Sequence, residues 1–240
     1  MRLLALLLAV GACEASHADP PHVAESPRSA ATYDHEAMVR FHMRERYTLL
    51  GAIQHLAIRG EVYETQVLAR LIGSSLDEPG LAKWRSQAGF ARSNAHELSM
   101  APTTEEACKR TARLAATCAA CHVDAKVVPL FAVPPPLPPD GASVDARMAR
   151  HVWATDRLFE GIIGGADESW LAGLDVLAQT PAPSVADDTE RVAFARRLQG
   201  LANDTKNRGT KDDFAARARA YGEILVVCSA CHAAEQRKAK

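Results

Sequence analysis

The sequence has few of the patterns that mark β-strands. Runs of valine, isoleucine and threonine are rare among its 240 residues, and alternating apolar and polar stretches bounded by hairpin turns are hard to find. Alanine, leucine, arginine and glutamate are frequent instead, and these residues favour helix over strand. We therefore expect an all-α protein, long enough to form one large domain or two of ordinary size.

The sequence also lacks an excess of charge of either sign. Its 28 lysine and arginine residues are balanced by 29 aspartate and glutamate residues, which gives a formal net charge of -1 at pH 7. A basic excess would suggest nucleic-acid binding, and an acidic tract would suggest a disordered tail. Because the sequence has neither, we expect no nucleic acid among the partners.

The first residues have the pattern of an export signal. Arg2 precedes an apolar run from Leu3 to Val10, which is too short to span a bilayer as a permanent helix, and small residues follow. The end of the run, VGAC, resembles a bacterial lipobox. By that resemblance residues 1–12 are removed and Cys13 becomes the lipidated first residue, which would attach the protein to a membrane. The alternative is cleavage after Ala18, which would give a soluble periplasmic protein.

Residues 13–32 are rich in alanine, serine, proline and histidine and show no period, so we expect a flexible tether. Both cleavage schemes export the protein to the periplasm. Its cysteines would therefore be in an oxidising compartment.

The chain contains two copies of one unit. The segment MRERYTLLGAIQHLAIRGEV, which begins at Met43, aligns with MARHVWATDRLFEGIIGGAD, which begins at Met148. The string CAACH then closes the first copy, and CSACH closes the second. Other matched pairs are Ile53 with Leu158, Ile58 with Ile163, and Gly60 with Gly165.

A proline-rich stretch, VPLFAVPPPLPPDGAS, separates the copies and favours an extended, semi-rigid linker. We therefore predict a first domain at 33–126, a linker at 127–143 and a second domain at 144–240.

Each copy has the pattern of four helices joined by short connections, which predicts two tandem antiparallel four-helix bundles. The helices are expected near 33–59, 62–75, 80–99 and 103–122, and again near 144–164, 167–179, 185–204 and 211–234. The strings DEPG at 77–80 and TPAPS at 180–184 break helices, and TKDD at 210–213 is typical of a helix start.

The last helix of each copy carries its CxxCH string on the face that a bundle buries. In the second copy this stripe has steps of four and three residues: Phe214, Ala218, Tyr221, Leu225, Cys228 and His232. In the first copy it is Thr104, Cys108, Thr111, Ala115, Cys118 and His122. We expect Cys108 to be a small buried apolar residue. A disulfide between Cys108 and Cys13 would require that Cys13 is not lipidated.

CxxCH is the attachment sequence of c-type haem. Two cysteines three residues apart each form a thioether to the porphyrin, and the following histidine becomes an axial ligand of the iron. The predicted attachment residues are Cys118, Cys121 and His122 in one copy, and Cys228, Cys231 and His232 in the other. A redox-active dithiol usually follows a strand, and zinc sites usually have much shorter spacings. We therefore expect two covalently bound haem c groups.

The second axial ligands must lie upstream, because only eight residues follow His232 and none is methionine. Met43 and Met148 are the methionines that match between the copies, and both fall on a first helix. They are our candidates, although methionine is more often a core residue. His42, His55, His96 and His151 lack matching histidines, and we place His42 and His151 first at the surface or edge. His151 remains the main exception, because it would give bis-histidine ligation in the second copy.

A CxxCH string that closes a four-helix bundle, with a methionine on the first helix, resembles the class II cytochromes c. This family includes cytochrome c′ and its low-spin relatives of the c556 type. The resemblance implies that a methionine at this position gives a six-coordinate electron carrier. An apolar residue there leaves iron open to nitric oxide or carbon monoxide. It also implies that homodimers can form through the first helix. The tandem arrangement departs from the family's usual single bundle.

We therefore expect an exported dihaem cytochrome that carries single electrons between redox partner proteins and is not an enzyme. One alternative is a gas-binding protein of the cytochrome c′ kind. A second is a dihaem enzyme such as a peroxidase, which would need acid–base groups over an open iron, with His151 or Glu45 as candidates. A third is a subunit whose haems serve a larger complex.

Overall fold

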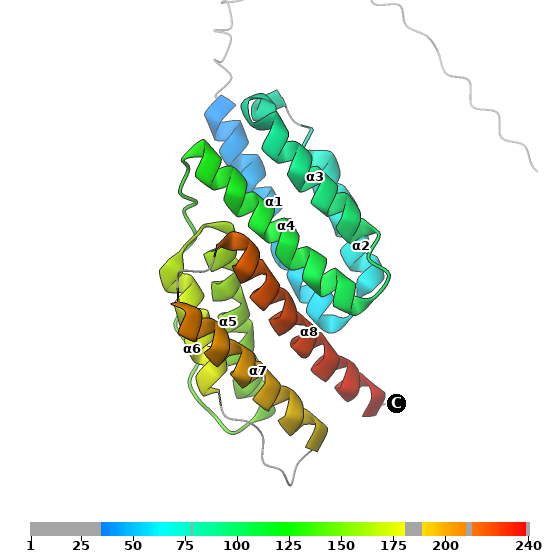
Figure 1. Cartoon of the computed structure of the whole chain (residues 1–240), viewed down its shortest axis with the longest axis vertical. Helices are drawn as coiled ribbons and strands as arrows, with labels where there is room; N and C mark the ends of the chain where they lie inside the picture. The colour runs from blue at the N-terminus through cyan, green and yellow to red at the C-terminus, as the bar shows by residue number, and fades with distance from the viewer. Residues whose placement is uncertain (1–34, 78, 181–188, 210–212, 239–240) are drawn as a thin grey trace, which may run out of the picture. The chain divides into compact units, whose positions relative to one another are not determined.

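A computed structural model describes residues 35–77, 79–180, 189–209 and 213–238 of the chain. These residues contain eight α-helices, one short 3₁₀ helix and no strand, so the all-α prediction is confirmed (Figure 1). The first four are α1 (His35–Arg59), α2 (Val62–Ser75), α3 (Arg85–Ser99) and α4 (Thr104–Ala125). The others are α5 (Val144–Ile163), α6 (Asp167–Gln179), α7 (Thr189–Arg208) and α8 (Phe214–Lys238). Cys13, the signal segment and the tether lie outside the described residues.

Several helix ends follow directly from local sequence. The bounds of α2 and α6 agree with the predicted ranges. The backbone N–H of Ala146 donates to the Ser143 hydroxyl at the start of α5, and that of Ala216 donates to the Asp213 carboxylate at the start of α8. Gly60 and Gly165, which match in the repeat, follow the ends of α1 and α5 with φ of +78° and +64°. Glycine suits these positions because it adopts positive φ without steric cost.

Other helix ends differ from the prediction. A 3₁₀ helix, η1 (Pro79–Trp84), occupies the start of the range expected for the third helix, so α3 begins only at Arg85. Proline lacks an amide N–H and glycine is a poor helix former, which disfavours an α-helix at this point. Parts of the predicted helix-breaking strings DEPG and TPAPS, and of the predicted helix start TKDD, lie outside the described residues. These parts are residues 78, 181–184 and 210–212.

Residues from both halves of the chain form one hydrophobic core. Residues His35–Lys240 form a single compact unit, and helices that follow one another in the sequence pack together within each half. The most extensive packing between any two helices joins α4 to α8, which lie side by side in Figure 1. Further contacts join α1 to α8 and α4 to α5. The two separate bundles expected from the sequence therefore remain a prediction.

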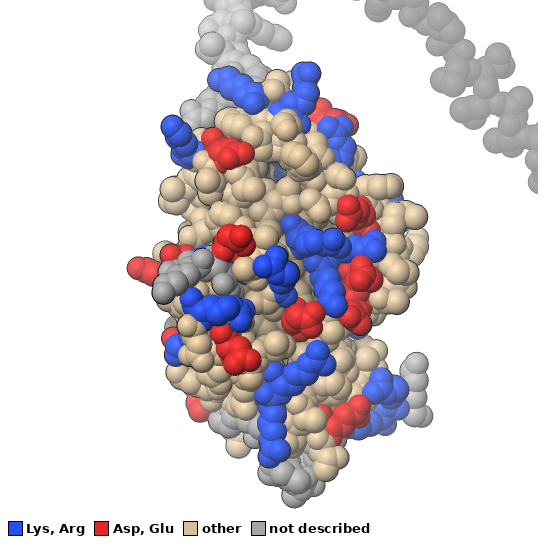
Figure 2. Space-filling model, in the orientation of Figure 1, with Lys and Arg blue, Asp and Glu red and all other residues tan. Residues whose placement is uncertain are grey.

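The contact between α4 and α8 depends on small residues. A Cβ added to Gly222 of α8 would lie 3.3 Å from the Cα of Lys109 and 3.6 Å from the Cβ of Ala112, both on α4. Charged side chains cover this contact, and Figure 2 shows basic and acidic groups interspersed there. Lys109 pairs with Glu105 at 2.7 Å and with Glu223, across the contact, at 3.3 Å.

The segment that joins the halves packs against the second one. The indole N–H of Trp153 donates to the Pro135 carbonyl at 2.8 Å, and the Arg150 guanidinium donates to the Pro138 carbonyl at 2.9 Å. The Phe131 ring contacts the Tyr47 ring, with centroids 5.4 Å apart. None of the described helices is both long and apolar enough to cross a membrane.

Candidate functional site

A cavity of about 200 Å³ brings together the site residues predicted for the second copy. Met148 and His151 line it from α5, and Cys228, Cys231 and His232 line it from α8. The walls are largely apolar and include Ile58, Val144, Val152, Leu177, Phe194, Ala195, Leu198 and Val227. Residues about 80 positions apart in the sequence thus meet around one apolar space.

Helix periodicity explains this arrangement. Cys228 and His232 are four residues apart on α8 and therefore lie on one face, with Cys231 beside them. Met148 and His151 are three residues apart on α5 and share a face in the same way. Contacts between α5 and α8 are few, because the cavity lies between them.

The two histidines of the cavity favour the neutral form. Burial lowers the pKa of His151 to about 4, with further lowering by Arg147, His232 and Arg150. Burial also lowers the pKa of His232, and Arg59 adds to this effect. A neutral imidazole is the form that binds a metal. The sequence placed His151 first at the surface or edge, whereas the structure places it in the cavity wall.

Three cysteines of the CxxCH strings, Cys118, Cys121 and Cys228, are poor candidates for thiolate chemistry. Burial raises the pKa of Cys118 and of Cys228 to about 12, and it raises the pKa of Cys121 as well. A dithiol that exchanges disulfides needs a lowered pKa, because the thiolate is the attacking species. This result argues against a redox-active dithiol at either string.

The first copy has a different set of neighbours around its methionine. Met43 is partly buried against the core, and an Arg46 guanidinium nitrogen lies 3.9 Å from its sulfur. Arg46 is itself buried, with 6% of its surface exposed, and donates to the Ser75 hydroxyl at 3.1 Å. Its positive charge also lowers the pKa of Cys118, against the larger effect of burial. The guanidinium beside Met43 therefore also acts electrostatically on Cys118.

His122 is directed toward the second half of the chain. Its ring nitrogen Nδ1 lies 3.0 Å from the carbonyl oxygen of Ile163, the last residue of α5. Because a carbonyl only accepts, Nδ1 carries the proton in this contact, and Nε2 is the ring nitrogen that remains for another partner. This hydrogen bond is the contact that the structure gives for the His122 ring, and it does not involve Met43.

The other candidates lie outside these sites. His42 pairs with Glu45 at 2.9 Å, and His96 is exposed. Cys108 is fully buried, as predicted, and burial raises its pKa to about 11. His55 lies 3.2 Å from Asp156, in a polar network between the halves.

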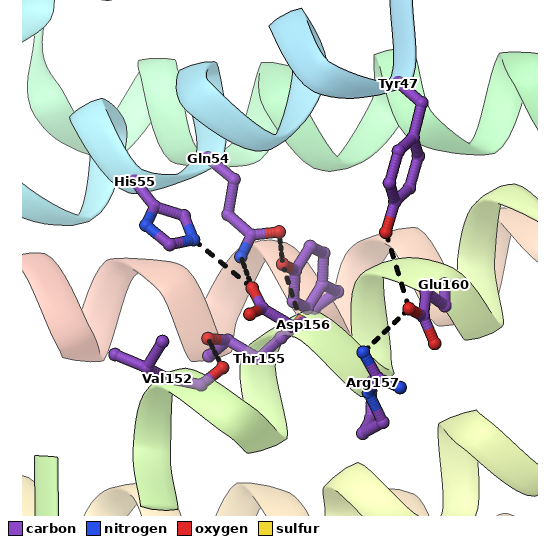
Figure 3. A network of polar contacts seen from close by, with 9 residues as sticks. Tyr47, Gln54, His55, Val152, Thr155, Asp156, Arg157 and Glu160 are labelled. Carbon is purple, nitrogen blue, oxygen red and sulfur yellow. Dashed lines mark hydrogen bonds and ion pairs between the residues drawn. The ribbon is translucent and has the colours of Figure 1, made fainter. Parts of the chain in front are cut away.

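Sequence analysis did not predict that polar network, which joins α1 to α5 and α8 (Figure 3). The Tyr221 hydroxyl donates to the Gln54 side-chain oxygen at 2.5 Å, and the Gln54 amide donates to Asp156 at 3.2 Å. The Tyr47 hydroxyl lies 3.4 Å from Glu160, which Arg157 contacts at 2.7 Å. Three of these contacts, Tyr221 with Gln54, Gln54 with Asp156 and Tyr47 with Glu160, join residues that are more than 100 positions apart along the chain. No local sequence pattern could therefore indicate them.

The residues of the second site fit a c-type haem by their chemistry. Two cysteines and a histidine on one wall face an apolar space with a methionine and a second histidine on the other. The cavity volume of about 200 Å³ is smaller than the roughly 300–1,000 Å³ of typical small-molecule sites. Within the described residues, no three histidine, cysteine, aspartate or glutamate side chains are grouped to hold a bare metal ion.

Comparison of the chain with protein-family models gave no match, and searches of curated proteins and of solved structures gave none either.

Proposed function

We propose that this protein is a dihaem c-type cytochrome that carries single electrons. The observation that supports it most is the apolar cavity that collects Met148, Cys228, Cys231 and His232. These are the residue types that attach and ligate a c-type haem, and they come from two helices that are distant in the sequence.

Each residue has a role in this proposal. Cys228 and Cys231 would hold the porphyrin through thioether bonds, and His232 and Met148 would bind its iron. Cys118, Cys121, His122 and Met43 would have these roles in the first half. The bound haem supplies an iron that accepts and releases one electron. The surrounding helices hold the ligands in place, exclude water and raise the reduction potential through burial.

The location and partners are also proposals. Cleavage before Cys13 and its lipidation would attach the protein to a membrane on the periplasmic side, whereas cleavage after Ala18 would release a soluble periplasmic protein. Electrons would come from one redox protein and pass to another. Homodimers through the first helix remain a prediction from the class II resemblance.

The decisive experiment is the absorption spectrum of the mature protein produced with haem-attachment machinery, oxidised and reduced, with and without carbon monoxide. Two haems per chain, low-spin bands, a sulfur-to-iron band and no response to carbon monoxide would support the electron carrier. High-spin bands that shift with carbon monoxide would favour the gas-binding alternative, and peroxide turnover would favour an enzyme. Absence of covalent haem would overturn the proposal.

A further inference from the structure

Each half of the chain places the end of its first helix beside the histidine of the other half. The His122 ring contacts the carbonyl of Ile163 at the end of α5, as described above. Ile58, which matches Ile163 in the repeat, lines the cavity that contains His232. The Gln236 side chain of α8 also donates to the Arg59 carbonyl at 3.3 Å. Each half therefore places the end of its first helix near the histidine of the other half, so these contacts are reciprocal.

Core contacts hold these two helix ends in place. Besides the close contact of α4 with α8, α1 contacts α8 and α4 contacts α5. The buried hydrogen bond from Tyr221 to Gln54 joins α8 to α1 at the same interface. The ends of α1 and α5 are thus fixed relative to the histidine-bearing helices.

The two histidines nevertheless differ in what their rings contact. Ile163 belongs to the last turn of α5, where carbonyls without an intrahelical partner carry partial negative charge. His122 donates to one of these carbonyls. The part of the chain that the structure describes gives the His232 ring no hydrogen-bond partner, and the positive charge of Arg59 acts on it instead.

Charged side chains are found at both sites. Arg46 lies at the first site, while Arg147 and Arg191 line the cavity of the second. Positive charge is thus present at both sites, and the paired Glu235 partly offsets it at the second. The carbonyl that accepts from the ring is a further feature, found at the His122 site and not given for His232 in the described part of the chain.

We propose, on the basis of the proposed function, that the Ile163 carbonyl makes the two haems inequivalent and gives the haem bound by His122 the lower reduction potential. A hydrogen bond from Nδ1 makes the imidazole a more basic ligand, and a more basic ligand favours iron(III) over iron(II). In a half-reduced molecule the single electron therefore resides on the haem bound by His232. Ile163 is a positioning residue, because it acts on the iron through His122.

Potentiometric titration of the dihaem protein tests this proposal. Two single-haem variants assign the potentials: Cys118→Ala with Cys121→Ala, and Cys228→Ala with Cys231→Ala. We expect at least a tenfold preference for the electron at the His232 haem, which corresponds to about 59 mV for a one-electron couple. Equal potentials, or the opposite order, would overturn the inference while leaving the proposed function intact.

The ring proton gives an independent readout. In ¹⁵N-histidine spectra of the reduced, diamagnetic dihaem protein, the Nδ1–H of His122 should exchange slowly with water and that of His232 rapidly. Similar rapid exchange at both rings would contradict the contact. A chain that acquires no haem would overturn the proposed function and this inference together.

The matched glycines provide a variant and its control. Gly165→Ala strains the residue two positions after Ile163 and brings a Cβ to 3.3 Å from the Phe214 ring. We expect faster exchange of the His122 Nδ1–H and a higher potential of its haem. Gly60→Ala has the same positive-φ strain but lies at the end of α1, so both quantities should stay unchanged. Identical effects of the two variants would indicate general loosening and overturn the inference.

Discussion

The two halves place different side chains one turn after their matched methionines. Arg46 follows Met43, whereas His151 follows Met148. The Arg46 guanidinium is buried and reaches Ser75 at the end of α2. The matching residues of the second half, His151 and Thr180, line the cavity. The repeat therefore preserves the backbone position and changes the group that occupies the space beside the methionine.

This difference has a chemical consequence. Arginine stays protonated and has no lone pair to offer a metal, whereas a neutral histidine does. If the second site binds haem as proposed, His151, whose pKa is lowered, lies in the cavity wall where it can replace a lost ligand. The first site has no equivalent at the matched position, since Arg46 occupies it.

Loss of the methionines should affect the halves unequally. Met43→Leu should leave one of the two irons five-coordinate, so that about half of the reduced haem binds carbon monoxide. Met148→Leu should give little carbon monoxide binding, because His151 can replace the lost sulfur. Absorption spectra of the reduced variants, with and without carbon monoxide, measure this. Met100→Leu is the control, because Met100 is 63% exposed and has no match in the repeat. Equal carbon monoxide binding by Met43→Leu and Met148→Leu would show that His151 does not replace the lost sulfur.

Separation of α4 from α8 should destabilise both halves together. Gly222→Leu places a side chain against the Lys109 backbone, and overpacking of this kind costs about 3 kcal/mol of unfolding free energy. Chemical denaturation followed by helix signal and by haem absorbance should show one lowered transition. Gly200→Leu is the matched control, because a Cβ at exposed Gly200 meets no atom within 4 Å. Two separate transitions, with one unchanged, would indicate that the halves fold independently.

The polar contact between the halves should contribute a smaller amount. Tyr221→Phe removes the donor to the buried Gln54 oxygen, which costs about 1–2 kcal/mol because that acceptor stays buried without a partner. The free energy of unfolding from urea titration checks this value. Tyr63→Phe, at a residue that is 69% exposed, should have no effect. The matching position on α4 is Thr111, whose hydroxyl donates within its own helix, so Thr111→Val should cost less than Tyr221→Phe.

The smallest effect concerns Cys108, where the second copy has Ala218. Burial raises the pKa of Cys108 to about 11, so its thiol stays protonated at pH 8. A thiolate-specific reagent should leave it unmodified in the native protein at that pH and modify it fully in denaturant. Mass spectrometry reports the modification, and Cys108→Ala provides the blank. Rapid labelling of the native protein would show that this part of the interface opens.

Local features of the sequence predicted much of the fold. The breakers around α2 and α6 fixed those helices to the residue, and Asp213 begins α8 through a capping hydrogen bond. The repeat placed Gly60 and Gly165 at equivalent helix ends. The stripe on α8 was also informative, because Ala218, Tyr221 and Leu225 are buried.

The packing between the halves could not be predicted in the same way. Gln54 and Asp156 are polar residues on separate helices, and their periodicity does not indicate that they meet. The glycine at 222, inside a helix, was a usable signal for close approach of another helix, since glycine there otherwise weakens the helix. For the candidate site, the CxxCH strings and methionines gave the residues of the second cavity, but only the tertiary structure placed His151 in its wall and His122 against Ile163.

The segment between the halves bears on how the chain assembles. Its contacts at Phe131, Pro135 and Pro138 fix it along α5 and against Tyr47. A connection fixed in this way keeps the two halves at a high effective concentration for each other. It also leaves little freedom for one half to pair with the matching half of a second molecule. The halves therefore pair within one chain, and their pairing should persist on dilution.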